Sequence, residues 1–281
     1  MPNLLSYEFM QNAILTGIMA SIVCGVIGPF IVARRMVFIS GGLSHTAFGG
    51  LGMAYWLGIN PIYGASLFVL FAALVIGWWE EKITKYDMFI GILWAFGVAV
   101  GIIFIHLTPG YVPDLMTFLF GNILTVSRTD MHITLLLTLI VTLPIFIFFR
   151  GLTFVTFDEE YARTRNLPVK GLNMLLISLV ALSIVTLIQV VGIILVIALI
   201  TIPVAIAGEL SGSFKGIMAL STIFGVFFCL FGLFLSYFGE LPSGATIIMT
   251  GVIALILIKG LKELATKCRH VKNRVAKSTP L

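Results

Sequence analysis

The chain has 281 residues, of which 59% are hydrophobic and only 10% are charged. A soluble globular domain carries about 25% charged residues, so this composition excludes a water-soluble protein and predicts a membrane protein with several spans. The net charge is +5, and the Lys and Arg residues between 259 and 281 account for it. A basic segment beside anionic lipid explains this charge, so a membrane-lipid partner is expected and a nucleic-acid partner is not.

Nine apolar segments are expected to cross the membrane, with eight to ten as the range, because a helix needs about 20 residues to span the hydrocarbon. They are residues 10–33, 40–58, 62–79, 88–106, 131–149, 172–190, 191–208, 216–238 and 243–261. The first has no basic region before it and no cleavage signal, so it reads as a span and not as a signal peptide. The sequence therefore predicts an all-α, polytopic membrane bundle over 1–261, followed by a basic cytoplasmic tail, 262–281.

Two places in this pattern are irregular. The sixth and seventh segments are barely separated, and Pro203 is expected to break the seventh because proline removes a helical hydrogen bond. Residues 114–127 are too short to cross and are expected to form a half-helix or re-entrant piece buried in protein.

Lys and Arg residues set the expected orientation, since they favour the cytoplasmic side. Placing Arg34 and Arg35 in the cytoplasm also places residues 150–170, Lys215 and the C-terminal tail there, and leaves Arg128 outside. The N-terminus is then expected outside and the C-terminus in the cytoplasm, which requires an odd number of spans.

His45 lies inside an apolar segment, on a stripe of glycines. At helical spacing Gly41, Gly49 and Gly52 share its face. Each glycine within a helix costs about 1 kcal/mol relative to alanine, so the stripe indicates that space or close packing is needed there. An ionisable side chain within a span is a candidate site, and His45 is therefore a candidate metal ligand. The alternative is a structural histidine, beside Ser44, that bonds to a neighbouring helix.

Carboxylates near the ends of spans are the other candidate ligands, because imidazole and carboxylate both bind divalent cations. Asp87 begins the fourth segment and Glu209 follows the seventh, and both are candidates for the metal. His106 and Glu240, at expected outer ends, are candidates for a gate. For each of them a cap or an interfacial position is the alternative. Gly97 and Gly101 form a small-xxx-small pair that suits close helix packing.

The longest polar interruption of the chain, 157–170, predicts a short charged helix at about 158–167 on the cytoplasmic side. Asp158 suits the N-cap, and acids suit the first turn while bases suit the last. Pro168 is expected to end the helix. The charged residues are Asp158, Glu159, Glu160, Arg163 and Arg165. A plain solvated loop is the alternative.

Five segments in order resemble the zinc/manganese permease family of ABC-type metal importers. They are residues 34–45, 119–124, 158–168, 191–207 and 241–246. The resemblance implies a permease subunit of a prokaryotic cell membrane that works as a homodimer. It also implies a separate cytoplasmic ATP-binding subunit, an extracytoplasmic metal-binding protein and a coupling helix at 158–167. The expected cargo is Zn²⁺ or Mn²⁺, and no intrinsic cofactor is expected.

The sequence departs from that family at the candidate site. Gly41 stands where many members have Asp, and Glu240 stands where relatives often have Asp before Pro-Ser-Gly. The histidine is therefore retained without its usual carboxylate partner, so another acid must supply charge or the site is looser.

The chain is not expected to be an enzyme, because it has no phosphate-binding Gly-Lys loop and ATP hydrolysis must come from another chain. Two transport alternatives remain open: a secondary metal transporter or channel without an ATPase, and an ABC permease for a metal chelate such as a siderophore. An intramembrane hydrolase built on Ser44 and His45 is a weaker alternative, because adjacent helical side chains point about 100° apart.

Overall fold

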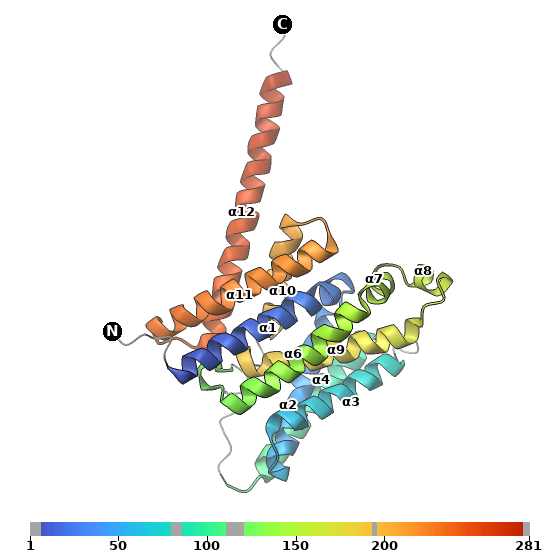
Figure 1. The fold of residues 1–281 in the computed structure, drawn as a ribbon, viewed down its shortest axis with the longest axis vertical. Helices are drawn as coiled ribbons and strands as arrows, with labels where there is room; N and C mark the ends of the chain where they lie inside the picture. Colours follow the sequence, from blue (N-terminus) through green and yellow to red (C-terminus); the bar gives the residue numbers. More distant parts are fainter. Residues whose placement is uncertain (1–6, 80–85, 111–120, 193–195, 278–281) are drawn as a thin grey trace.

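The computed structural model describes residues 7–79, 86–110, 121–192 and 196–277 (Figure 1). Every regular element in this part of the chain is a helix, so the prediction of an all-α fold is confirmed. The elements are α1 (Glu8–Ala33), α2 (Val37–Leu57), α3 (Pro61–Trp79), α4 (Tyr86–Leu107), η2 (Ile123–Thr125), α6 (Arg128–Ile147), α7 (Phe149–Phe157), α8 (Glu159–Thr164), α9 (Val169–Val191), α10 (Val196–Leu210), α11 (Phe214–Gly239) and α12 (Ser243–Lys277).

Each of the nine expected spans has a helix, but the helices differ in their capacity to cross a membrane. Within the described residues, α1, α3, α4, α6, α9, α11 and α12 are long and apolar enough. The 21-residue α2 carries a series of glycines and polar side chains, and the apolar α10 has 15 residues. The count of nine is therefore approximate, and the two less regular spans are those that carry or adjoin the candidate site.

Helix α1 forms the centre of the bundle, and α11, α6, α9 and α10 pack around it (Figure 1). Most of its apolar stretch is buried, whereas little of the corresponding stretch of α4 is. Asn12 on α1 is buried and donates a hydrogen bond to the carbonyl oxygen of Val126, which ties the N-terminal part of α1 to the segment before α6. A central apolar helix of this kind requires neighbours on every side, as in a polytopic bundle.

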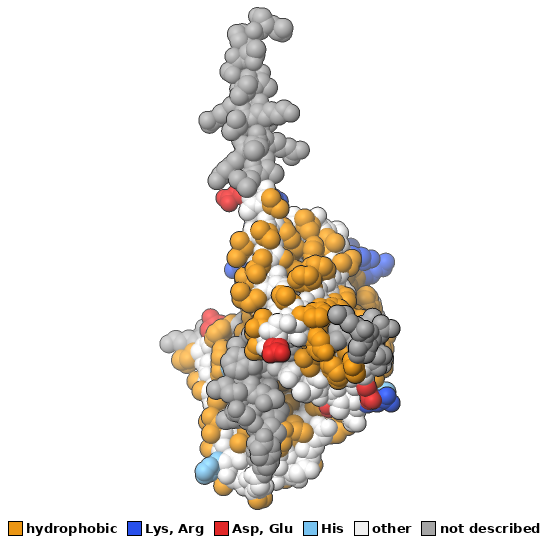
Figure 2. Space-filling view, turned by 90° about the vertical axis from the view of Figure 1, so that its left-hand side faces the viewer, with side chains coloured by type: hydrophobic (Ala, Val, Ile, Leu, Met, Phe, Trp, Pro, Cys, Tyr) orange, Lys and Arg blue, Asp and Glu red, His pale blue; other side chains and the backbone are white. Residues whose placement is uncertain are grey.

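The outer surface is apolar, as a bilayer requires. Figure 2 shows one face covered largely by hydrophobic side chains, with few charges among them. Large exposed side chains include Phe96 on α4, Phe227 on α11 and Ile256 on α12. In water such patches would mark interfaces or aggregation sites. On this chain they suit contact with lipid or with another membrane subunit.

The prediction that Pro203 breaks the seventh span is wrong. Pro203 lies inside α10, which continues to Leu210. The chain instead interrupts its helix at Gly192, which caps α9 at φ 76°. Proline within a membrane helix is tolerated where neighbouring groups satisfy the freed carbonyl, and Pro29 and Pro144 likewise lie inside helices.

The structure describes only part of the expected half-helix, and it continues the last expected span into the expected C-terminal tail. Residues 111–120 of the expected half-helix, 114–127, lie outside the described residues, and the described remainder forms η2 and its flanks. Helix α12 runs from Ser243 to Lys277; its first half packs on α11 and α10, and its C-terminal part projects away from the bundle (Figure 1). The expected boundary between 261 and 262 therefore falls inside one continuous helix.

Candidate functional site

The glycine stripe of α2 packs closely against α4. A Cβ atom added to Gly52 would collide with the backbone of Gly101, and one added to Gly49 would come within 2.9 Å of the carbonyl oxygen of Gly97. In return, Gly97 faces the backbone of Thr46. The two small-residue patterns therefore meet each other, as in close-packed membrane helix pairs. The space made by Gly49 and Gly52 is filled by a neighbouring helix.

Gly41, at the other end of the stripe, borders an open groove. An added Cβ would approach Ile197 on α10 at 2.9 Å and Trp94 on α4 at 3.7 Å. The groove has a volume of about 570 Å³ and is lined by Val32, Arg35, Val37, Phe38, Gly41, Trp94 and Ile197. It lies where α2, α4 and α10 meet, at the end of α2 that follows the Arg34–Arg35 turn. An aspartate at Gly41 would require the Ile197 side chain to move.

His45 stacks on Trp94. The ring centres are 4.2 Å apart and the ring planes differ by 16°. His45 is half-buried, and we find no hydrogen bond from its ring to another described residue. Stacking engages the face of an imidazole, whereas its nitrogen lone pairs lie in the ring plane and point outward from the edge. Trp94 can therefore orient the ring while leaving its ligand atoms able to bind a cation.

The hydrolase alternative has no geometric support at this site. The Ser44 hydroxyl is buried and donates to the carbonyl oxygen of Ser40, 2.7 Å away, in its own helix. A serine nucleophile would instead need a hydrogen bond to the base.

The remaining metal and gate candidates lie apart along the helices. Asp87 is exposed in the first turn of α4, and His106 is exposed in its last turn. Glu240 is the exposed C-cap of α11, with a left-handed φ of 51°. Among the described residues, no group of three or more His, Cys, Asp or Glu side chains is close enough to hold a metal ion. Within the described residues, one copy of the chain thus offers His45 as a ligand but not the further ligands that a bound metal ion needs.

Glu209 forms an ion pair that links two helices. Its carboxylate lies 2.6 Å from the ammonium of Lys262 on α12, which also donates to the Glu209 carbonyl oxygen at 2.9 Å. The lysine therefore neutralises the acid and satisfies a backbone carbonyl at the end of α10. A metal ion at Glu209 would have to compete with this ammonium.

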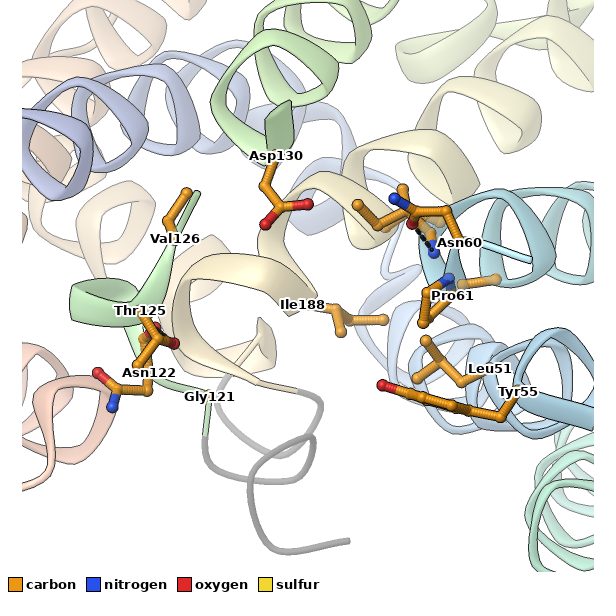
Figure 3. A pocket seen from close by; sticks show the side chains of 13 residues that line it. Leu51, Tyr55, Asn60, Pro61, Gly121, Asn122, Thr125, Val126, Asp130 and Ile188 are labelled. Carbon is orange, nitrogen blue, oxygen red and sulfur yellow. Dashed lines mark hydrogen bonds between the residues drawn. The ribbon is translucent and has the colours of Figure 1, made fainter. Parts of the chain in front are cut away.

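A second, more polar cavity lies where the α2–α3 turn, the segment before α6 and the C-terminal part of α9 meet (Figure 3). Its volume is about 290 Å³, and its polar lining comes from Tyr55, Asn60, Asn122, Thr125 and Asp130. Asp130 also closes the capping box of α6 by accepting from the Ser127 backbone N–H at 3.3 Å, and it accepts from the Ser127 hydroxyl at 2.7 Å. Sequence reasoning missed this cavity because its residues come from separate segments and have no recognisable spacing.

The expected charged helix is present as α8, which is shorter than expected at Glu159–Thr164. Asp158 is its N-cap, and its carboxylate accepts from the Tyr161 backbone N–H at 2.8 Å. Ala162 is fully buried, whereas Arg163 and Arg165 are exposed. The helix packs on the bundle through the buried Ala162 and presents Arg163 and Arg165 outward, so the loop alternative is wrong.

Comparison with known proteins covers almost the whole of this architecture. The ABC 3 transport family matches residues 6–261. An uncharacterised membrane protein of Synechocystis is 45% identical over 254 residues, which is 90% of both chains. The manganese transport system membrane protein MntC of Halalkalibacterium halodurans is 38% identical over 247 residues, covering 88% of this chain and 85% of that protein.

A solved structure agrees with the fold. PsaBC from Streptococcus pneumoniae, in complex with Fab, contains a chain that superposes with a TM-score of 0.82 at 36% identity, covering 91% of this chain and 92% of that one. The family match, the identities to these relatives and the superposition lead to one assignment. The chain is a member of the ABC 3 transport family, and it shares its fold with a chain of PsaBC.

Proposed function

We propose that this chain is the permease subunit of an ATP-driven importer for a divalent metal ion, with manganese as the first candidate and zinc as the second. The observation that carries the proposal is similarity over nearly the full length to permeases named for manganese transport. The proposed complex contains two copies of this chain, a separate cytoplasmic ATP-binding subunit and an extracytoplasmic metal-binding protein. Its place is the cell membrane of a prokaryote, with the N-terminus outside and the C-terminus in the cytoplasm.

His45 is the proposed metal ligand within the path. A divalent cation that enters hydrocarbon must exchange its water for protein ligands, and manganese prefers oxygen ligands to a set of imidazoles. One imidazole with one carboxylate and water would bind loosely enough to release the ion. Because Gly41 cannot supply the carboxylate, we propose that Asp87 or Glu209, from the same copy or the second one, completes the site. His106 and Glu240 are the proposed gate residues on the outer side.

Helix α8 is the proposed docking element for the ATP-binding subunit. Glu160, Arg163 and Arg165 are exposed, at the end of the bundle that the charge pattern predicts to be cytoplasmic. Binding of ATP would close the two ATPase subunits and move α8, and this movement would switch access to His45 from one side of the membrane to the other.

The test is ATP hydrolysis by the reconstituted complex. The permease, its ATP-binding subunit and its binding protein are placed in lipid vesicles, and hydrolysis is measured with Mn²⁺, Zn²⁺ or Fe²⁺. We expect stimulation by manganese above the other two. Activity indifferent to all three ions would contradict the metal assignment, and stimulation by an iron-siderophore complex alone would favour chelate transport. Metal uptake by the permease alone, without the ATPase, would favour a secondary transporter.

A further inference from the structure

A polar bridge joins three elements at the expected cytoplasmic end of the bundle. Arg34 follows the last residue of α1, Asn173 lies on α9, and Glu159 begins α8. The Arg34 guanidinium donates to the Asn173 side-chain oxygen at 2.5 Å, and the Asn173 amide nitrogen donates to the Glu159 carboxylate at 2.6 Å. Arg34 and Asn173 are 139 positions apart in the sequence, so this bridge is purely a product of the fold.

The amide of Asn173 suits this position because it both accepts and donates. An asparagine offers a carbonyl oxygen to a cation and an NH₂ group to an anion in one short side chain. Both bonds have one charged partner, and such bonds are shorter and stronger than neutral ones. Asn173 is half-buried, so the bridge is partly shielded from water. A neutral residue thus connects a positive and a negative side chain that belong to different helices.

The Arg34 end of the bridge lies at the elbow that leads to the candidate metal ligand. The chain turns through Arg34 and Arg35, and α2 begins at Val37 and carries His45. Arg35 adopts φ 58°, the left-handed region that non-glycine residues rarely occupy. The backbone N–H of Arg34 bonds to the Phe30 carbonyl, which fixes the elbow to the last turn of α1. A displacement of Arg34 therefore acts on the start of α2.

The Glu159 end of the bridge lies on the proposed docking helix. A ring contact between Tyr161 and Phe154 holds α8 to α7, its neighbour in the sequence. The bridge reaches further, from α8 across α9 to the end of α1. It is a physical connection between the surface where the ATPase is proposed to bind and the elbow that leads into α2, the helix that bears His45.

We propose that Asn173 is a positioning residue that transmits movement of α8 to the α1–α2 elbow, and so couples ATP hydrolysis to metal transport. This inference rests on the proposed function, because it assumes that an ATP-binding subunit docks on α8. It adds a specific route within this chain. A side chain that merely stabilises the bundle would affect assembly, whereas a transmitting one changes how much metal moves for each ATP.

The experiment exchanges the groups of the bridge. Asn173→Asp keeps the acceptor for Arg34 but places a carboxylate against Glu159. Adding Glu159→Gln restores a donor to that carboxylate, so the double variant rebuilds both hydrogen bonds with the charges redistributed. Asn173→Leu removes the bridge, and Lys170→Ala is the control, since Lys170 lies on the same end of α9 but over the ring of Trp78 on α3. Metal uptake and ATP hydrolysis are measured on the same vesicles of the full complex.

We expect Asn173→Asp and Asn173→Leu to lower the metal transported per ATP by about fivefold or more, the lower range for coupling between two sites. The double variant should recover most of the ratio, and Lys170→Ala should retain it. An unchanged amount of metal per ATP in both Asn173 variants would overturn the inference. So would a decrease in metal per ATP that the double variant does not reverse. So would dissociation of the complex with hydrolysis and uptake falling together. Absence of metal-stimulated hydrolysis in the parent would instead refute the proposed function.

Discussion

The imidazole of His45 and the indole of Trp94 lie nearly parallel, with their centres 4.2 Å apart, across the interface of α2 and α4. The same two helices meet through facing glycines one and two turns further along. Because both contacts belong to one interface, the orientation of the imidazole depends on how tightly α2 packs on α4. The metal chemistry proposed here is thus tied to helix packing.

The stacking partner should control affinity for the metal. An aromatic pair of this kind contributes about 0.5–1.5 kcal/mol beyond its buried area. Trp94→Leu should therefore raise the metal concentration needed for half-maximal uptake by about two- to tenfold, while the assembled complex is retained. Trp56→Leu is the matched control, because Trp56 belongs to the same α2–α4 interface: it lies on α2, and its ring centre is 5.4 Å from that of Phe104 on α4. Equal effects of the two variants would show that the stack has no special role.

The glycine interface should tolerate no added carbon. Gly52→Ala places a methyl group against the backbone of Gly101, which cannot rotate aside. We expect a loss of about 1–3 kcal/mol of stability, as for other overpacked sites, and a lower melting temperature in detergent. Gly91→Ala, on α4 with no atom within 4 Å of the added carbon, should be neutral or slightly stabilising. A Gly52→Ala protein as stable as its parent would contradict the packing described here.

The two candidate acids can be separated by amide substitution. Glu209 is engaged by Lys262, whereas Asp87 is exposed and makes no ion pair with another described residue. We therefore expect Asp87→Asn to raise the metal concentration needed for half-maximal uptake more than Glu209→Gln does. A partly exposed ion pair contributes about 0–1 kcal/mol, so Glu209→Gln should change the melting temperature little. The reverse order of effects on uptake would make Glu209 the ligand.

The expected orientation can be tested by cysteine labelling. Asn60 lies between α2 and α3, and Thr164 ends α8, so the two should face opposite sides of the membrane. In a parent protein with its native cysteines replaced by alanine, Asn60→Cys should react with a membrane-impermeant maleimide in intact cells. Thr164→Cys should react only after the cells are opened. Labelling of both in intact cells would reject the proposed cytoplasmic position of α8.

Much of the fold could be predicted from the sequence, because apolar length and charge asymmetry are local signals that a bilayer imposes strongly. Asp158 as a cap and the short charged helix are also local features, and both are present. Pro203 misled the prediction, because tertiary packing keeps a helix through a proline while Gly192 supplies the interruption. The glycine stripe indicates room around His45, and only the fold shows that Gly49 and Gly52 on α2 meet Gly97 and Gly101 on α4.

The candidate site was less accessible to sequence reasoning. Trp94 and Asn173 belong to no motif. Trp94 matters because it contacts His45, 49 positions away in the sequence, and Asn173 because it contacts Arg34, 139 positions away. Contacts between helices far apart in the sequence depend on how the helices rotate and cross, which the period of the apolar residues does not fix. The same limit explains why Asp87 and Glu209 could be named as acids but not placed relative to His45.

The most direct measurement is uptake of radioactive manganese into vesicles that contain the full complex, comparing the parent, His45→Ala and His132→Ala. His132 is the control because it is an exposed histidine in the first turns of α6. If His45 binds the ion in transit, His45→Ala should lower uptake at least about tenfold, which corresponds to about 1.4 kcal/mol, while the complex stays assembled and His132→Ala stays close to the parent. Uptake by His45→Ala at the parental rate would contradict the account.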